Sequence, residues 1–303
     1  MNYLKLIRPI NILLILFTML LVKYALLDLL NVKVALNTWQ YGLLIFATCS
    51  IGAAGNVVND IFDETTDRIN KPEKMIVWRL ISERSAYRFY VVLNVIGVGA
   101  GFYLANSIGS PSFAAIFILV SALLYLYATQ FKQYLLVGNI LISLLVAMAL
   151  IVIIIFDIFP AIDTDQIDLQ VVASQTILGY AFFAFYFNLI REIVKDVQDI
   201  DGDKNAGRSS LPMVIGRVRT GKVIFTLGLL GLVSLLWFTY QHLYNYKLTV
   251  LYVIAALGIP LVIFCVKSWD AATKSEFGVL SNLLKIILLT GIGSLYFYAQ
   301  TLI

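Results

Sequence analysis

Long apolar runs occupy most of this 303-residue chain and constrain its fold more than any other feature. Each run has about 20 residues, which as a helix is long enough to cross the hydrocarbon core of a bilayer. Helices are the spanning element that fits, because the period-2 alternation of barrel strands is absent. The runs cover residues 10–30, 39–59, 86–106, 112–130, 135–156, 171–191, 221–241, 248–267 and 279–300. We therefore predict an all-α, multi-pass membrane protein in which residues 1–303 form one domain of nine transmembrane helices.

Positive charge is concentrated in alternate connections between these runs. The basic connections hold Arg68, Lys71, Lys74, Arg79 and Arg84, and then Lys195, Lys204, Arg208, Arg217 and Arg219. The intervening connections carry few basic residues, and one of them holds an acidic stretch from Asp157 to Asp168. With nine helices, the basic connections and the N-terminus fall on one side of the membrane. The positive-inside rule predicts that this side is cytoplasmic and that the C-terminus is external.

The pattern Asp-x-x-Asp-x-x-x-Asp occurs twice, each time where an apolar run ends. The two copies are Asp60, Asp63 and Asp67, and Asp196, Asp199 and Asp203. Residues at i, i+3 and i+7 share one side of a helix, where three carboxylates repel one another unless a cation lies among them. Magnesium prefers oxygen ligands and keeps water or substrate phosphates in its shell. The repeated triplet therefore predicts a site for a hard divalent metal and a ligand that carries phosphate.

The residues around the triplets predict that both lie near helix ends. Asn59 extends the row of Asp63 and Asp67 at i, i+4 and i+8, and Pro72 requires that the first helix has ended before it. Gly202 weakens the helix beside the third carboxylate of the second triplet, which favours a helix that opens into a loop. We therefore expect two cytoplasmic acidic motif loops.

Basic side chains near the triplets are the predicted diphosphate contacts, because charge-assisted hydrogen bonds to phosphate are strong. They are Lys71, Lys74, Arg79, Lys195, Lys204 and Arg208. Metal ions acting as Lewis acids would neutralise the charge on a departing diphosphate. The alternative interpretation is a pair of solvated, mixed-charge loops; two triplets of the same spacing on one side argue against it. Calcium-binding loops are a further alternative, but the EF-hand glycine and glutamate are missing.

An aromatic stretch from Tyr180 to Phe187 precedes the second triplet. At helical spacing some of its rings face the bundle interior, where ring faces can stabilise a developing cation by about 0.5–2 kcal/mol each. We expect such rings to line a channel for an isoprenoid chain; the alternative is ordinary core or lipid-facing packing. Tyr125 and Tyr127 are further candidates beside Lys132 and Asn139, although both tyrosines suit an interfacial belt equally well. The predicted channel residues are Tyr125, Phe183, Tyr186, Phe187 and Asn139.

The paired motifs resemble those of the UbiA superfamily of intramembrane prenyltransferases. Asn59, Asp63 and Asp67 match its Asn-x-x-x-Asp-x-x-x-Asp element, and Asp199 and Asp203 match its second, Asp-x-x-x-Asp element. Weaker marks of the superfamily are Arg8-Pro9, Lys132 with Gly138-Asn139, and Leu211-Pro212. The resemblance implies a nine-helix bundle whose central cavity is capped by the motif loops. It also implies Mg²⁺-dependent transfer of a prenyl group from an isoprenyl diphosphate donor.

The resemblance also suggests a role for each acidic residue. Its metal ligands are Asn59, Asp63, Asp67, Asp199 and Asp203. Asp60 and Asp196 remain candidates for the group that accepts the proton from the acceptor, and Lys132 joins the predicted diphosphate contacts.

The prenyl tail is expected to enter the bundle from the lipid bilayer. The acceptor is expected to be hydrophobic or amphiphilic, and no nucleic-acid partner is expected. Many aromatic prenyltransferases have Arg-Pro-Leu after the first motif, where this chain has Lys74-Met75-Ile76. The chain resembles the digeranylgeranylglyceryl phosphate synthase-like branch more closely, which implies a geranylgeranylglyceryl phosphate-type acceptor. An aromatic acceptor of quinone biosynthesis, 4-hydroxybenzoate or dihydroxynaphthoate, is the alternative.

Other classes of protein fit the sequence less well. A cation-coupled transporter would carry acidic residues near the membrane midplane, whereas here the acids cluster at one face and inverted half-repeats are not evident. Lys23 and Lys285 are charged exceptions in the helix cores and are expected to be structural or to extend toward the interface. A membrane-embedded assembly protein would leave the repeated triplet unexplained. One histidine and two distant cysteines argue against a zinc site or a Ser-His-Asp triad.

Overall fold

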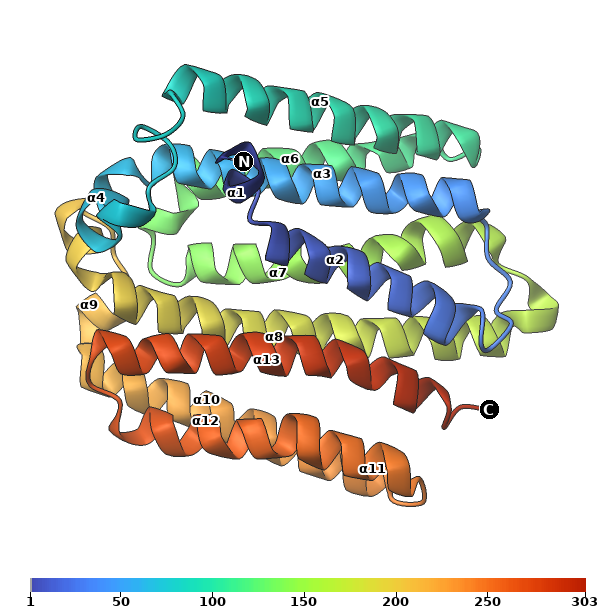
Figure 1. Ribbon diagram of the computed structural model, residues 1–303. Coiled ribbons are helices and arrows are strands. Elements are labelled where there is room, and N and C mark those ends of the chain that lie inside the picture. Colours follow the sequence, from blue (N-terminus) through green and yellow to red (C-terminus); the bar gives the residue numbers. More distant parts are fainter. Residues whose placement is uncertain (1) are drawn as a thin grey trace.

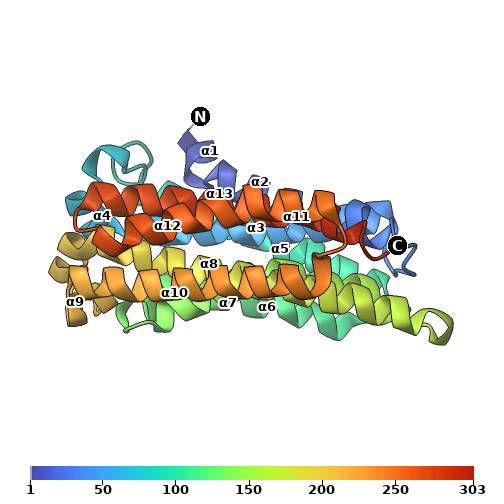
Figure 2. The same ribbon diagram turned by 90° about the horizontal axis from the view of Figure 1, so that it is seen from below.

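A computed structural model describes residues 2–303, except the side chain of Lys74, and shows helices lying side by side along one long direction (Figures 1 and 2). Within residues 2–303, nine helical segments are long and apolar enough to span a membrane. They cover Pro9–Leu27, Thr38–Phe62, Glu83–Ser107, Pro111–Thr129, Val137–Ala161, Thr164–Asn205, Arg217–Leu243, Lys247–Asp270 and Lys274–Ala299. Each predicted run overlaps one segment, so the prediction of an all-α, multi-pass membrane protein is confirmed.

The described residues form thirteen α-helices, and capping residues fix where some of them begin. The α-helices are α1 (Asn2–Leu6), α2 (Pro9–Leu21), α3 (Thr38–Phe62), α4 (Glu64–Asn70), α5 (Glu83–Ser107), α6 (Ala114–Thr129), α7 (Val137–Ile153), α8 (Ile167–Asn205), α9 (Leu211–Ile215), α10 (Arg217–Phe238), α11 (Lys247–Val253), α12 (Ile259–Asp270) and α13 (Lys274–Ala299). Asn37 and Gln40 form a capping box at the start of α3, and Thr273 and Glu276 form one at the start of α13. Such boxes satisfy backbone N–H groups that a helix start leaves free.

The two larger of three apolar clusters hold the bundle together, and α8 contributes to both. The first cluster joins α2, α3, α6 and α7 to the first half of α8. The second joins the later part of α8 to α10, α12 and α13. A 39-residue helix is about 58 Å long at 1.5 Å per residue, which exceeds the thickness of the hydrocarbon core. Its last turns carry the second acidic motif on helical backbone, with Val197 still packed in the second cluster.

Apart from Asp63, both acidic motifs lie on helical backbone, which differs from the predicted motif loops. Gly202 is inside α8, and its backbone N–H donates to Asn70 Oδ1 of α4 over 3.0 Å. A Cβ at this position would lie 2.7 Å from the Thr66 carbonyl oxygen. The glycine thus serves the close approach of α4 to α8 rather than the end of a helix. Asp63 forms the junction between α3 and α4, and α4 ends before Pro72 as predicted.

A buried ion pair lies at the end of the bundle away from the motifs. Lys23 Nζ donates to Asp157 Oδ2 over 3.0 Å, and the other carboxylate oxygen accepts the Leu36 backbone N–H over 2.8 Å. Both charged residues lie on π-helical turns, Val22–Leu27 and Ile154–Ile158, that extend α2 and α7. Lys23 therefore has a structural role, which agrees with one of the two roles expected for it.

Candidate active site

A cavity of about 560 Å³ lies inside the bundle and has one charged end and one apolar end. One face of α3 lines it at helical spacing from Thr48 to Asp60. All six aspartates of the two triplets and Asn59 line its charged end. Ile116 of α6 and Met148 of α7 are among the apolar side chains that line the remainder. The chain thus combines a polar site with an adjoining space suited to a hydrocarbon tail.

Two basic side chains join the two motifs across the cavity, and a third, Lys132, contacts the first motif alone. Arg208 donates to Asp63 Oδ1 over 2.7 Å and to Asp203 Oδ1 over 3.3 Å, so one guanidinium contacts both motifs. Lys71, which follows α4, donates to Asp199 Oδ2 of α8 over 2.9 Å. Lys132 donates to Asp63 Oδ1 over 2.6 Å. The two motifs are therefore opposite sides of one site.

The carboxylates of the first motif differ in their electrostatic environment. Burial alone would raise the pKa of Asp63, but the charges of Lys132 and Arg208 outweigh burial and hold this pKa well below its usual range. Burial and the neighbouring Asp63 charge raise the pKa of Asp67 to about 6. Burial lowers the pKa of Lys132 despite its contact with Asp63. Asp63 therefore remains ionised at neutral pH, while Asp67 takes up a proton in mildly acidic solution.

The donor set of the two motifs suits a hard divalent cation. It consists of carboxylate and amide oxygens, and Asp199 Oδ1 is buried without a hydrogen-bond partner among the described residues. No three acidic side chains in residues 2–303 converge closely enough to hold a metal by themselves. Magnesium does not need such a cage, since it is usually held by one or two carboxylates together with water and substrate phosphates. The residues present therefore fit the predicted metal.

The predicted phosphate contacts divide into two groups. Lys71, Lys132, Lys195 and Arg208 line the cavity. Arg79 and Lys204 are exposed and lie outside its lining, and the Arg79 guanidinium instead donates to the Pro72 and Glu73 carbonyl oxygens. The side chain of Lys74 lies outside the described residues. A phosphate in the cavity would thus meet four of the seven predicted cations.

The structure places the predicted aromatic channel residues elsewhere. Phe183 packs where a Cβ on Gly291 of α13 would lie, and Phe187 packs against Gly231 of α10. The Tyr186 hydroxyl donates to the Leu227 carbonyl oxygen over 2.7 Å. This face of α8 is turned toward α10 and α13, so these three rings belong to the second apolar cluster rather than to the cavity.

The fourth predicted ring also lies outside the cavity, whereas Asn139 lies in it. Tyr125 is 39 % exposed and packs edge-on against Phe62. Asn139 lines the cavity as predicted. The aromatic residues that line the cavity among the described side chains are Phe117, Tyr127 and Tyr134.

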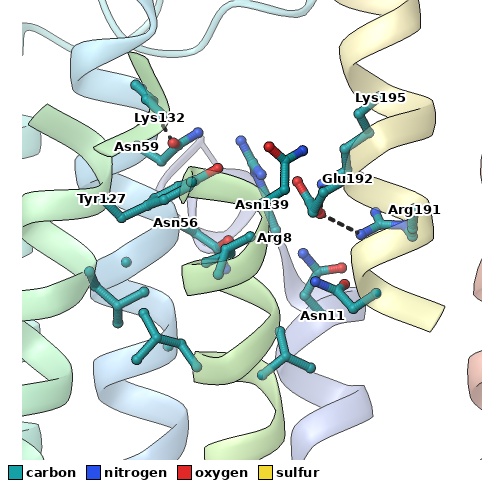
Figure 3. A pocket seen from close by; sticks show the side chains of 18 of the residues that line it. Arg8, Asn11, Asn56, Asn59, Tyr127, Lys132, Asn139, Arg191, Glu192 and Lys195 are labelled. Carbon is teal, nitrogen blue, oxygen red and sulfur yellow. Dashed lines mark hydrogen bonds and ion pairs between the residues drawn. The ribbon is translucent and has the colours of Figure 1, made fainter. Parts of the chain in front are cut away.

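Several polar residues of the cavity were missed as site residues by the sequence analysis. Figure 3 shows Arg8, Asn56, Arg191 and Glu192 around the charged end. Arg191 and Glu192 precede the second motif on the same face of α8, at the end of a predicted apolar run. Two adjacent charges in such a position are costly unless they face protein or water. That cost is the sequence signal that could have identified them.

The two candidate proton acceptors have different partners. The Arg8 guanidinium donates to Asp60 Oδ1. Asp196 Oδ2 accepts a hydrogen bond from the Asn139 amide over 2.8 Å. Asp60 is thus paired with the positively charged Arg8, whereas Asp196 accepts a hydrogen bond from the neutral Asn139 amide.

A bundle of membrane-spanning helices around a cavity that is acidic at one end and apolar beyond defines an integral membrane protein that handles an amphiphilic ligand. Residues 12–285 match the UbiA prenyltransferase family. This match covers most of the chain, which therefore belongs to that family and is a prenyltransferase.

Individual relatives agree with this assignment. A digeranylgeranylglyceryl phosphate synthase from Methanosphaera stadtmanae is 26% identical over 287 residues, 94% of each chain. A solved structure of a digeranylgeranylglyceryl phosphate synthase has a TM-score of 0.60 at 22% identity, covering 98% of this chain and 97% of the other. A UbiA homolog from Archaeoglobus fulgidus bound to GPP and Mg²⁺ has a TM-score of 0.54 at 17% identity, covering 97% and 99%. At these identities the two structures support the fold.

Proposed function

We propose that this protein transfers a prenyl group from an isoprenyl diphosphate to the hydroxyl of a geranylgeranylglyceryl phosphate-type acceptor, with Mg²⁺ as cofactor. The observation that carries the proposal is Arg208, whose guanidinium contacts Asp63 of one motif and Asp203 of the other. An anionic group between the motifs would be surrounded by cations and by metal-ligating oxygens at once. The similarity to the synthase from Methanosphaera stadtmanae supports the acceptor, and the Archaeoglobus fulgidus homolog supports the donor and metal.

The two motifs would hold the donor's diphosphate from opposite sides. Asn59, Asp63 and Asp67 would ligate metal from α3 and α4, and Asp199 and Asp203 from α8. Bound Mg²⁺ would neutralise the charge that develops on the departing diphosphate. Lys71, Lys132 and Arg208 would turn from carboxylates to phosphate oxygens, where charge-assisted hydrogen bonds stabilise the leaving group.

The remaining residues would position the reacting groups and exclude water. The prenyl tail would occupy the apolar end of the cavity, beside Phe117 and Met148. When the allylic C–O bond breaks, the acceptor hydroxyl oxygen forms the new C–O bond and releases its proton. We assign this proton to Asp196, because its partner is the neutral Asn139 amide, whereas Asp60 is engaged by Arg8.

A transfer assay with purified protein tests this function. Radiolabelled geranylgeranyl diphosphate would be offered with geranylgeranylglyceryl phosphate, 4-hydroxybenzoate or dihydroxynaphthoate, with and without EDTA. We expect an ether product from the first acceptor, and its loss in EDTA and in Asp199→Asn. Transfer to an aromatic acceptor alone would refute the proposed acceptor. Full activity of Asp199→Asn would refute the metal assignment.

The motif end of the bundle would face the cytoplasm under the same proposal. Basic residues are concentrated in its connections, whereas Lys33 and Lys247 are the basic residues in or directly beside the opposite connections. Cysteines introduced at exposed Lys204 and exposed Lys247 would report the orientation in intact cells. An impermeant maleimide should label the Lys247→Cys variant and leave Lys204→Cys unlabelled. The reverse pattern would show the opposite orientation.

A further inference from the structure

Two basic side chains in the cavity are separate from the ion pairs that join the motifs. Lys195 Nζ donates to Glu192 Oε1 over 2.5 Å, and Arg191 Nη1 contacts the same oxygen at 3.4 Å. Among the contacts of the described residues, neither cation has an ion pair with an aspartate of the motifs. Arg191 and Lys195 lie one turn apart on α8 and, as Figure 3 shows, on the side that faces the cavity. We call Arg191, Glu192 and Lys195 the inner cluster.

The inner cluster has an excess of positive charge and an unused donor. Its two cations share one carboxylate, and Arg191 Nε is buried without a hydrogen-bond partner in the described part of the chain. Burying a donor without a hydrogen-bond partner costs free energy, and a ligand that accepts a hydrogen bond from it would remove this cost. The side chains of Arg191 and Glu192 are only 14% and 10% exposed. An anion that enters the cavity would meet the Arg191 donor and the Lys195 ammonium together.

The position of the cluster suits an anion other than the donor's diphosphate. At 1.5 Å per residue, Arg191 lies about 12 Å along α8 from Asp199, on the side away from the motif end. Asp196 lies between them, about 7 Å from the level of Arg191. Reacting atoms approach to about 3–3.5 Å, and a glycerol phosphate carries its phosphate a few bonds from the free hydroxyl. An acceptor with its hydroxyl at Asp196 would therefore reach the inner cluster with its phosphate.

We propose that Arg191 and Lys195 bind the phosphate of the acceptor and thereby select phosphate-bearing lipids over uncharged alcohols. This inference rests on the proposed function and assigns Lys195 to the acceptor instead of the donor. Glu192 orients the two cations and leaves one positive charge uncompensated for the phosphate. The acceptor's glycerol hydroxyl is then held beside Asp196 and the donor's allylic carbon.

The test compares two acceptors that differ in one group. Wild-type protein, Arg191→Gln, Arg191→Lys and Lys195→Gln are each assayed with geranylgeranylglyceryl phosphate and with the same lipid lacking its phosphate. We expect the wild-type preference in kcat/KM for the phosphate lipid to fall about 10- to 100-fold in Arg191→Gln. Arg191→Lys should retain most of this preference. The KM for the prenyl diphosphate should stay within about twofold of wild type in each variant, as a separate anion site requires.

Arg219→Gln is the matched control, because Arg219 is exposed on α10 and lies outside the cavity lining. An equal loss of activity with both lipids in Arg191→Gln and Lys195→Gln would overturn the inference while leaving the proposed function intact. Product from an aromatic acceptor, with none from either glycerol lipid, would overturn both. Thermal unfolding of each variant identifies any that fail to fold, and the inference is then decided by the other two.

Discussion

The close approach of α4 to α8 at Gly202 predicts a large effect from one methyl group. In Gly202→Ala, the new Cβ would lie 2.3 Å from Asn70 Nδ2 and 2.7 Å from the Thr66 carbonyl oxygen. The Asn70 side chain could rotate away, but it would then lose its hydrogen bonds to the Gly202 backbone N–H and to the Asp199 carbonyl oxygen. The Thr66 oxygen is backbone and cannot rotate away. The distance to it is about 0.7 Å short of the 3.4 Å at which ordinary contact begins.

Helix α4 must therefore move away from α8 by a large part of an ångström. This movement would widen the gap between Asp67 on α4 and Asp199 on α8, the two faces of the diphosphate site. A misplacement of about 1 Å can lower a catalysed rate about 10²-fold. We expect kcat/KM for prenyl transfer to fall by about that factor in Gly202→Ala, although alanine is the better helix former.

Gly179→Ala is the matched control, because Gly179 lies in the same helix and a Cβ there meets no atom within 4 Å. This variant should keep wild-type transfer and gain up to about 1 kcal/mol of stability from helix propensity. The assay is labelled prenyl transfer at several Mg²⁺ concentrations, with thermal unfolding measured in parallel. If Gly202→Ala transfers prenyl groups within twofold of wild type, the proposed tight fit between the motifs is wrong.

Three further predictions follow from the ion pairs and the rings. Asp63→Ala should lower the free energy of unfolding by about 3–5 kcal/mol, because Lys132 and Arg208 lose their shared buried partner; Glu64→Ala, which breaks an exposed pair with Arg68, should cost about 1 kcal/mol or less. The half-saturating Mg²⁺ concentration for transfer should rise as the pH falls through about 6, because a metal binds the ionised form of Asp67. If the same pH dependence of this concentration persists in Asp67→Asn, the assignment to Asp67 is wrong. Tyr186→Phe should cost about 1 kcal/mol of stability by removing the hydrogen bond to the Leu227 carbonyl oxygen, and prenyl transfer should stay unchanged. A strong loss of transfer would contradict the placement of this ring outside the cavity.

The sequence was sufficient for the parts of the molecule that depend on periodic hydrophobicity and on local spacing. The nine spans follow from the length of each apolar run, and Pro72 marks the end of α4 as expected. The two aspartate triplets predict a shared site because positive charge places both at one end of the bundle. These are properties of neighbouring residues along the chain, which a sequence displays directly.

Properties that depend on contacts between helices were not predictable in the same way. Gly202 interrupts helix propensity locally, yet α8 continues through it because α4 packs against that face. Phe183 and Phe187 share a helix with the second motif, but the rotation of α8 turns them toward α10 and α13. The charge of Arg191 at the end of an apolar run indicates that it does not face lipid, but only the packing of the neighbouring helices shows that it lines the cavity. In each case tertiary packing decides between alternatives that the local sequence leaves equal.

The pairing of Lys71, Lys132 and Arg208 with the motif carboxylates has a thermodynamic consequence for the order in which ligands bind. A metal ion bound alone would ligate these carboxylates and leave the cations without partners. A diphosphate bound alone would pair with the cations and leave the carboxylates without partners. When both enter, each set of charges exchanges one partner for another. The affinities of the metal and the diphosphate are therefore reciprocally linked, and each should raise the affinity of the other by the same factor. With such positive cooperativity, the site would bind the metal more weakly before the donor is bound than afterwards.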